Sequence, residues 1–252
     1  MVWPNINILP FDEGPAKVYG KLRADLEKKG TPLNEPDLRI ASMEENGLKE
    51  PPLKRPLDIA LSSLMLAVSA PVALIIALAI KMEDGGPVFY RQERWGWKGR
   101  KFRAFKFRTM IPHSDRLYGI RPAEEKDPRI TRVGRVLRNM GLDELPQIAN
   151  ILLGDMSFVG PRSLAVGEII REESGEVIPH EELPAFRERL KVRPGLTSLA
   201  TIYIPKDSSP YRKFRYDLLY IRKQSLWLDL RLIALSFWIS FRGKWETRSS
   251  KI

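Results

Sequence analysis

The sequence predicts a mainly α-helical fold with a small β-hairpin, in the α+β class. Three observations support this prediction. Residues 59–80 form an apolar run of about 22 residues without a charge, which as a helix at about 1.5 Å per residue could cross the roughly 30 Å core of a bilayer. A strand–turn–strand pattern follows between residues 88 and 107. Apolar residues then recur at helical spacing in several later segments.

The chain divides by composition into four parts. Residues 1–53 form a polar, proline-rich N-terminal extension, in which residues 15–30 are expected to form a short helix. Residues 54–84 contain the apolar segment, residues 85–245 form the main domain, and residues 246–252 form a polar tail. The N-terminus lacks the basic start and apolar core of a cleavable signal, so we expect none there.

The apolar segment has two features that complicate a simple membrane span. Pro71 lies near its middle, two residues after Ser69, and basic residues flank both ends. Lys and Arg gather on the cytoplasmic side of membranes. An internal proline bends a helix, and a nearby serine hydroxyl can bind the freed carbonyl. A kinked span and a re-entrant helix, which bends at Ser69 and Pro71 and returns to the same side, are both open. A buried helix of a soluble protein fits less well, because the segment is apolar on every face.

The segment after the apolar run predicts a basic β-hairpin. Residues 88–90 are expected to form a short strand, residues 95–99 a turn, and residues 102–107 the returning strand. A single acid, Glu93, lies among eight basic residues: Arg91, Arg94, Lys98, Arg100, Lys101, Arg103, Lys106 and Arg108. Such a hairpin suits either the surface of lipid headgroups or a cradle for phosphate.

Two short helices are expected next in the chain. The first covers residues 130–140 and ends at Gly141; the second begins near residue 142, has Pro146 in its first turn and ends at Gly154. This arrangement places Asp143 and Glu144 at or just before a helix N-terminus.

The C-terminal third combines irregular and strongly apolar segments. Residues 154–162 are expected to form a loop, and residues 191–200 a turn followed by an extended piece. Residues 211–245 are rich in Leu, Trp and Phe but are interrupted by Asp229. They predict either a helix that lies in the membrane interface with Trp at headgroup level, or a core helix of the main domain.

Composition limits the possible chemistry. The net charge is +11 and the pI is about 9.8, which favours an anionic partner such as nucleic acid, anionic lipid or a phosphorylated substrate. The chain has no cysteine, which excludes disulfides and thiolate catalysis. Its two histidines, His113 and His180, lack ligand spacing and are expected to be surface residues rather than metal ligands.

The adjacent carboxylates of Asp143 and Glu144 have a structural and a chemical interpretation. Acids at a first helical turn cap free N–H groups and oppose the macrodipole. However, helix N-termini also bind phosphate, and three arginines precede the pair: Arg132, Arg135 and Arg138. One carboxylate could attack phosphorus and the other could bind Mg²⁺ together with substrate phosphates. The pair therefore suits phosphoryl transfer.

The chain resembles the bacterial sugar transferases of the monotopic phosphoglycosyl transferase family. The resemblance begins at KRPLD (54–58) and extends to about Phe241, so the first fifty or so residues lie outside it. Its motifs occur in order: GGPVFYRQERWG (85–96), KFRTM (106–110), DPRITRVGRVLRNMGLDELPQIANILLGDMSFVGPR (127–162), RPGLT (193–197) and YDLLYIRKQSLWLDLRLI (216–233). Together, behind an apolar segment with a central proline, they form a very specific pattern.

The resemblance implies an activity, partners and a location. These enzymes transfer a sugar-1-phosphate from a UDP-sugar to polyprenol (undecaprenyl) phosphate, release UMP, and initiate surface glycan synthesis. It implies a re-entrant helix and interfacial helices around a catalytic core on the cytoplasmic face of the bacterial inner membrane. The exposed hairpin and interfacial helices leave room for a homodimer.

The resemblance also implies roles for individual residues. Asp143 matches a nucleophile that carries a covalent aspartyl-phosphosugar intermediate, and Glu144 matches a ligand of the Mg²⁺ cofactor. The positions matching substrate phosphate-binding residues are Arg138, Lys106, Arg108 and Arg162. Asp155 and Asp217 match acidic positions whose roles are either catalytic or structural.

The chain departs from the family pattern at three places. Ser163 replaces the last proline of GPRP, Ser198 replaces the glycine of PGITG, and Ala70 separates the Ser69 and Pro71 that are often adjacent. The first two could alter loops near the sugar pocket. Two rival functions need none of these motifs: a membrane-tethered nucleic-acid binder that uses the aromatic, basic hairpin, and a membrane scaffold without catalysis.

Overall fold

The main domain combines helices with three small two-stranded sheets among the described residues. The computed structural model describes residues 50–114, 127–171, 177–183, 185–205, 208–243 and 245, all within the second of two compact units, 49–252. The expected helix at residues 15–30 and the polar tail lie outside them. The α+β class is confirmed, but the expectation of a single hairpin was incomplete.

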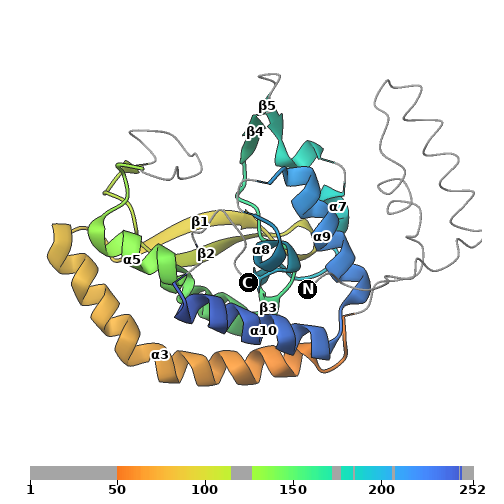
Figure 1. Cartoon of the computed structure of the whole chain (residues 1–252), viewed down its shortest axis with the longest axis horizontal. Coiled ribbons are helices and arrows are strands. Elements are labelled where there is room, and N and C mark those ends of the chain that lie inside the picture. The colour runs from red at the N-terminus through yellow and green to blue at the C-terminus, as the bar shows by residue number, and fades with distance from the viewer. Residues whose placement is uncertain are drawn as a thin grey trace, which may run out of the picture. The chain divides into compact units, whose positions relative to one another are not determined.

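Helix α3, Lys54–Asp84, is one continuous helix of 31 residues that includes Pro71. It bends along its length (Figure 1) and ends at Gly85, whose φ of 70° is left-handed. Among the described residues it is the one helix long and apolar enough to cross a membrane, and only 11% of its most apolar window is buried. Pro71 itself is exposed. The apolar run is therefore a helix with a largely uncovered surface.

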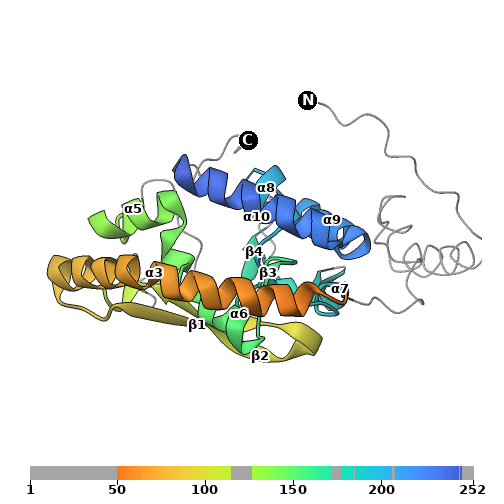
Figure 2. The ribbon, with the colours of Figure 1, turned by 90° about the horizontal axis from the view of Figure 1, so that it is seen from below.

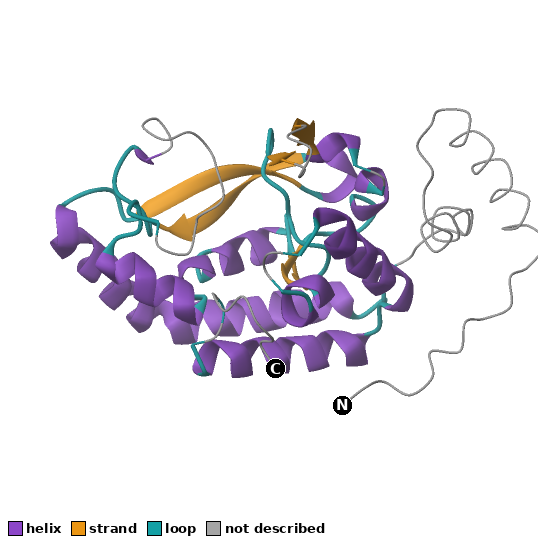
Figure 3. Ribbon diagram, turned by 45° about the horizontal axis from the view of Figure 1, so that its top comes forward, coloured by secondary structure: helices purple, strands orange, loops and turns teal. Residues whose placement is uncertain are grey.

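The predicted hairpin is confirmed and its strands are longer than expected. Strand β1, Phe89–Trp95, pairs antiparallel with β2, Lys101–Phe107, through a short 3-10 turn at Trp97–Gly99. The register aligns Tyr90 with Lys106 and Arg94 with Phe102. Figure 3 shows this hairpin as the longest pair of strands, lying across the helices.

Helix α5, Arg132–Met140, ends at Gly141 as predicted, but it begins two residues later than expected, after the Thr131 cap. A 3-10 turn, Leu142–Glu144, follows it, and helix α6, Gln147–Leu153, ends at Gly154. The second helix thus begins at Gln147, later than expected, because Pro146 cannot donate a backbone hydrogen bond and serves as its N-cap.

The expected loop at residues 154–162 instead contains a strand. Strand β3, Ser157–Val159, pairs in parallel with β6, Gly195–Thr197, and all three β3 residues are buried. The strand was not predicted because its three residues are all buried and so show no apolar–polar alternation, and because its partner strand lies far along the chain. Gly195 allows the close approach, since a Cβ there would lie 2.1 Å from the Gly160 nitrogen. Strands β4, Ile169–Arg171, and β5, Val177–Pro179, form the third, antiparallel pair.

The C-terminal segment forms two long helices and is preceded by two short ones. Helices α7, Phe186–Arg189, and α8, Leu199–Tyr203, precede α9, Pro210–Lys223, and α10, Leu226–Phe241. Helix α10 buries Leu232 and Ile239 but exposes Trp227 and Phe241, so it has a core side and an uncovered apolar side. Strand β3 contacts α3, α6 and α10, and Figure 2 shows α9 and α10 on the side opposite α3.

Both ends of α3 are fixed to this body. Near its C-terminus, Ile76 and Ile80 pack with Phe107 of β2 and Leu137 of α5. Near its N-terminus, the Asp58 carboxylate accepts hydrogen bonds of 3.1 Å from the Ser157 hydroxyl and from the Phe158 N–H. The helix is thus attached to the domain that carries the hairpin and α5 at each end.

Candidate active site

The 3-10 turn between α5 and α6 presents Asp143 and Glu144 to the hairpin. Lys106 of β2 lies between the two carboxylates: its Nζ is 3.9 Å from Asp143 Oδ2 and donates a hydrogen bond to Glu144 Oε1. The Glu144 side chain is 28% exposed, which leaves room for a ligand. The structure thus brings together three residues that the sequence placed in one site, although Lys106 lies far from the other two in the chain.

Three cations determine the protonation of Glu144. Burial raises the pKa of Glu144, but the attraction of Lys106, Arg162 and Arg94 outweighs it and lowers that pKa to about 2. Glu144 is therefore ionised at neutral pH. The positive charge around it suits a substrate with several phosphate charges.

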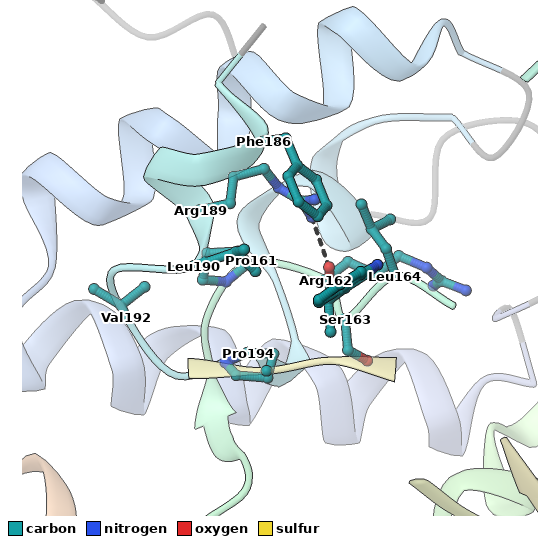
Figure 4. A pocket seen from close by; sticks show the side chains of 11 residues that line it. Pro161, Arg162, Ser163, Leu164, Phe186, Arg189, Leu190, Val192 and Pro194 are labelled. Atoms are coloured by element: carbon teal, nitrogen blue, oxygen red, sulfur yellow. Dashed lines mark hydrogen bonds between the residues drawn. The ribbon is translucent and has the colours of Figure 1, made fainter. Parts of the chain in front are cut away.

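Arg162 follows β3 and has an exposed side chain on a firmly held backbone. Its carbonyl accepts a 2.6 Å hydrogen bond from Arg189 Nη2 (Figure 4). Arg189 is itself buried against Asp217, with Nε and Nη2 at 2.9 and 2.7 Å from Asp217 Oδ2, and it stacks over the ring of Phe214. Asp217 therefore has a structural role: it binds Arg189, and Arg189 in turn holds the backbone of the Arg162 loop.

The small pocket in Figure 4 lies at this loop. Residues of the hairpin turn, the Arg162 loop and α7 line it, among them Trp95, Ser163 and Phe186. Its lining includes Arg162 but none of Asp143, Glu144 and Lys106. The pocket is therefore separate from the carboxylate pair, which forms the centre of the candidate site.

The remaining predicted cations have different surroundings. Arg138 is half-buried in the last turn of α5, immediately before the turn with the carboxylates, and its carbonyl accepts from Gly141 N–H at 3.2 Å. Arg108 is buried and pairs with Asp84 at the end of α3, with Nη1 at 2.6 Å from Oδ2, and it also donates to the carbonyls of Pro87 and Met110. These contacts tie α3 to β2, and a phosphate-binding role for Arg108 stays a prediction.

Sequence reasoning did not single out Arg94. Its side chain on β1 is 7% exposed, and its Nη1 donates to the Ser163 hydroxyl at 2.8 Å. The period-two alternation of strands could have indicated it: Arg94 and Lys106 lie on the same face of the hairpin, because their cross-strand partners are Phe102 and Tyr90.

A second cluster that the sequence did not reveal lies at the start of α3. The buried Lys54 Nζ donates to Asp229 Oδ2 at 2.5 Å, to the Tyr220 hydroxyl at 3.0 Å and to the Val159 carbonyl at 2.9 Å. Asp229, which interrupts the apolar pattern of α10, is therefore the counter-ion of a residue at the start of α3. Burial, and then repulsion between a tyrosinate and the Asp229 carboxylate, raise the pKa of Tyr220.

The expectation for the histidines was half correct. His113 is exposed, but His180 is buried, where its Nδ1 lies 3.0 Å from the Glu168 carbonyl and its ring stacks with Phe214. A hydrogen bond and a ring contact explain its burial. Asp155, the other acid with an open role, accepts a 3.2 Å hydrogen bond from the Asn150 amide, which also binds the β2 backbone.

Comparisons with known proteins agree with these observations. Residues 49–243 match the family model described as bacterial sugar transferase. A UDP-glucose:undecaprenyl-phosphate glucose-1-phosphate transferase of Xanthomonas campestris pv. campestris is 43% identical over 70% of this chain and 37% of its own length. The exopolysaccharide production protein PSS of Rhizobium leguminosarum bv. phaseoli is 39% identical over 72% of this chain and 91% of its own length.

A relative with a different sugar in its name is nearly as similar. The UDP-N-acetylgalactosamine-undecaprenyl-phosphate N-acetylgalactosaminephosphotransferase of Aeromonas hydrophila is 37% identical over 72% of this chain and 42% of its own length. The match covers only 35 to 40% of the first relatives in the comparison, which are longer proteins.

Proposed function

Because this chain belongs to the bacterial sugar transferase family, we propose that it transfers a sugar-1-phosphate from a UDP-sugar to undecaprenyl phosphate. The observation that carries the proposal is the contact of Lys106 with both Asp143 and Glu144, beside Arg162 and Arg94. This arrangement offers a nucleophilic carboxylate next to cations that neutralise phosphate charge. The named relatives supply the substrates: a UDP-sugar donor and undecaprenyl phosphate as acceptor.

In the first step, an Asp143 carboxylate oxygen attacks the β-phosphorus of the UDP-sugar. The bond from this phosphorus to the oxygen bridging to the α-phosphate breaks, and UMP leaves with the bond electrons. Asp143 then carries the sugar-phosphoryl group as an acyl phosphate. Lys106 and Arg162 stabilise the charge that develops on the phosphoryl oxygens and on the leaving group.

In the second step, an oxygen of undecaprenyl phosphate attacks the same phosphorus. The acyl phosphate bond breaks, Asp143 is regenerated as a carboxylate, and undecaprenyl diphosphate sugar forms. Both displacements occur at the same phosphorus. The Asp143 carboxylate must therefore be reached first by the soluble donor and, once it carries the phosphosugar, by the lipid acceptor. The exopolysaccharide relative suggests a surface polysaccharide as the eventual product.

The residues present fit a magnesium ion, with Glu144 as its expected ligand. Mg²⁺ in such sites is bound by one or two carboxylates together with substrate phosphates and water. Glu144 is ionised and partly exposed, and the described residues contain no cluster of three or more candidate ligands, so substrate oxygens would complete the coordination. When bound, the ion neutralises phosphate charge.

We further propose that α3 enters the membrane and returns, on the cytoplasmic face of the bacterial inner membrane. Lys54 at one end and Asp84 at the other both bond to the same domain, which is hard to reconcile with ends on opposite sides of a bilayer. The exposed apolar residues of the bend are then available to lipid: Leu64, Val68, Val72, Leu74, Ile75 and Leu78.

The donor is tested by incubating the purified chain in lipid nanodiscs with undecaprenyl phosphate, Mg²⁺ and a panel of UDP-sugars. We expect UMP release from UDP-glucose or a UDP-N-acetylhexosamine, and none without the lipid acceptor beyond a single turnover. Folded protein that releases no UMP from any UDP-sugar would contradict the proposed function and favour a scaffold.

A further inference from the structure

Arg94 is a buried cation without a counter-ion in the part of the chain that the structure describes. Its guanidinium bonds are all to neutral groups: Gln92 Oε1 at 3.1 Å from Nη2, the Ser163 hydroxyl at 2.8 Å and the Ser163 carbonyl at 3.4 Å from Nη1. No described carboxylate lies within 4.0 Å of it, and burial lowers the pKa of Arg94. Glu144 and Glu168 attract Arg94 only through space, and a buried charge without a directly bonded counter-ion is costly, so an anion bound at Arg94 would be stabilised.

The position of Arg94 indicates which anion this is. It lies on the Lys106 face of the hairpin, within electrostatic range of Glu144 and Arg162. Lys106, Arg94 and Arg162 lie around the carboxylates of Asp143 and Glu144, and Glu168 also attracts Arg94 through space. A bound phosphate group would give the Arg94 fork a directly bonded partner that its planar geometry suits.

Ser163 gives this arginine a fixed direction. Its buried hydroxyl accepts a hydrogen bond from Arg94 Nη1. The adjacent residue is Arg162, whose carbonyl is held by Arg189. One short loop therefore orients two cations: Arg162 through its backbone and Arg94 through the Ser163 side chain.

We propose that Arg94 binds a phosphate of the bound UDP-sugar and that Ser163 is its positioning residue. The proposal rests on the proposed function and extends it to a residue on the opposite strand from Lys106.

The test is the affinity of the full chain in nanodiscs for UDP, measured by isothermal titration calorimetry. Loss of a charge-assisted contact is expected to weaken binding by roughly tenfold or more in Arg94→Gln. Ser163→Ala, which removes only the hydroxyl, is expected to weaken it by about two- to fivefold. Arg91→Gln is the matched control, because Arg91 is exposed on the other face of β1 and its guanidinium lies over Phe105; its affinity should stay within about twofold.

The melting temperature without ligand separates binding from a structural role. Removal of an uncompensated buried charge should leave the Tm of Arg94→Gln unchanged or raise it, while UDP affinity falls. Wild-type UDP affinity in folded Arg94→Gln would overturn the proposal, and so would a large loss of Tm in both Arg94→Gln and Arg94→Lys with unchanged affinity of the folded fraction.

The same variants distinguish this inference from the proposed function. UDP binding that depends on Arg94 in a wild-type protein that releases no UMP would support the phosphate site and contradict the transferase. UMP release by the wild-type protein, together with an unchanged UDP affinity in Arg94→Gln, would support the transferase and contradict the phosphate site.

Discussion

Lys106 connects the two carboxylates on which the chemistry depends. It lies 3.9 Å from Asp143 and bonds to Glu144, and its charge lowers the pKa of Glu144. The residue therefore keeps Glu144 ionised, and its ammonium group is placed to attract phosphate oxygens near Asp143.

Glu144 predicts a pH dependence of stability. Its pKa is lowered to about 2 in the folded protein, below the roughly 4.3 of an unfolded glutamate. The stabilisation from its ionised form is fully present above about pH 4.3 and is lost as the pH falls towards 2. We expect Glu144→Gln to lower the Tm by roughly 2–4 °C at pH 7, and by progressively less below about pH 4.3.

Differential scanning calorimetry of both proteins between pH 3 and 8 checks this expectation. Asp84→Asn removes the acid that pairs with Arg108. It is a control for the general effect of losing an acid on the Tm. A Tm difference between wild type and Glu144→Gln that grows as the pH falls would contradict the assigned cause.

The residues of the site were only partly predictable from the sequence. Asp143, Glu144 and Lys106 could be named because their motifs are specific, and the structure brings them together. Arg108 was grouped with them because it matches the same motif as Lys106, but it lies just past the end of β2 and pairs with Asp84 at the end of α3. Arg94 was one of eight basic residues, and only the hairpin register shows its face.

At the scale of elements, the buried Lys54–Asp229 pair joins the start of α3 to α10. Because removal of one partner leaves an uncompensated buried charge, Lys54→Met is expected to reduce the free energy of unfolding by about 3–5 kcal/mol. Replacing both, in Lys54→Met with Asp229→Leu, should recover most of this loss, since Tyr220 can still donate to the Val159 carbonyl.

Urea denaturation followed by tryptophan fluorescence measures these differences. Arg55→Met is a neighbouring control, because Arg55 bonds only to the carbonyls of Ile151 and Leu152 in the described part of the chain. A double variant no more stable than Lys54→Met would show that the pair does more than compensate charge.

Local signals predicted some elements well and others not at all. Gly141 and Gly154 ended helices as expected, because both adopt positive φ. The hairpin followed from its alternation and turn. Strands β3 and β6 could not be predicted, because each has three residues and their pairing is decided by the packing of Gly160 against Gly195. Residues 211–245 were treated as one segment, although Ser225 caps a separate helix there.

At the scale of the whole molecule, the attachment of both ends of α3 predicts its topology. The chain has no cysteine, so single cysteines can be placed at Leu53, 61% exposed, and at Met82, 86% exposed. In intact inverted and right-side-out vesicles, a membrane-impermeant maleimide should label both positions from the cytoplasmic side only. A cysteine at the exposed Arg103 on the hairpin marks that side.

Labelling of Leu53→Cys and Met82→Cys from opposite sides would establish a span and contradict the re-entrant helix. Pro71→Ala tests the cause of the return, because a helix without proline has less reason to bend. We expect the Met82→Cys label to shift partly to the opposite side in that background.

The most direct test of the central claim is a single-turnover measurement of UMP release by wild type and Asp143→Asn. Without acceptor, the wild-type protein should release about one UMP per active site and retain the sugar phosphate in an acid-stable, hydroxylamine-sensitive form, as expected of an acyl phosphate. Asp143→Asn should fold and bind membranes normally, yet release no UMP. Full release by that variant would show that another group, or the acceptor itself, attacks the donor.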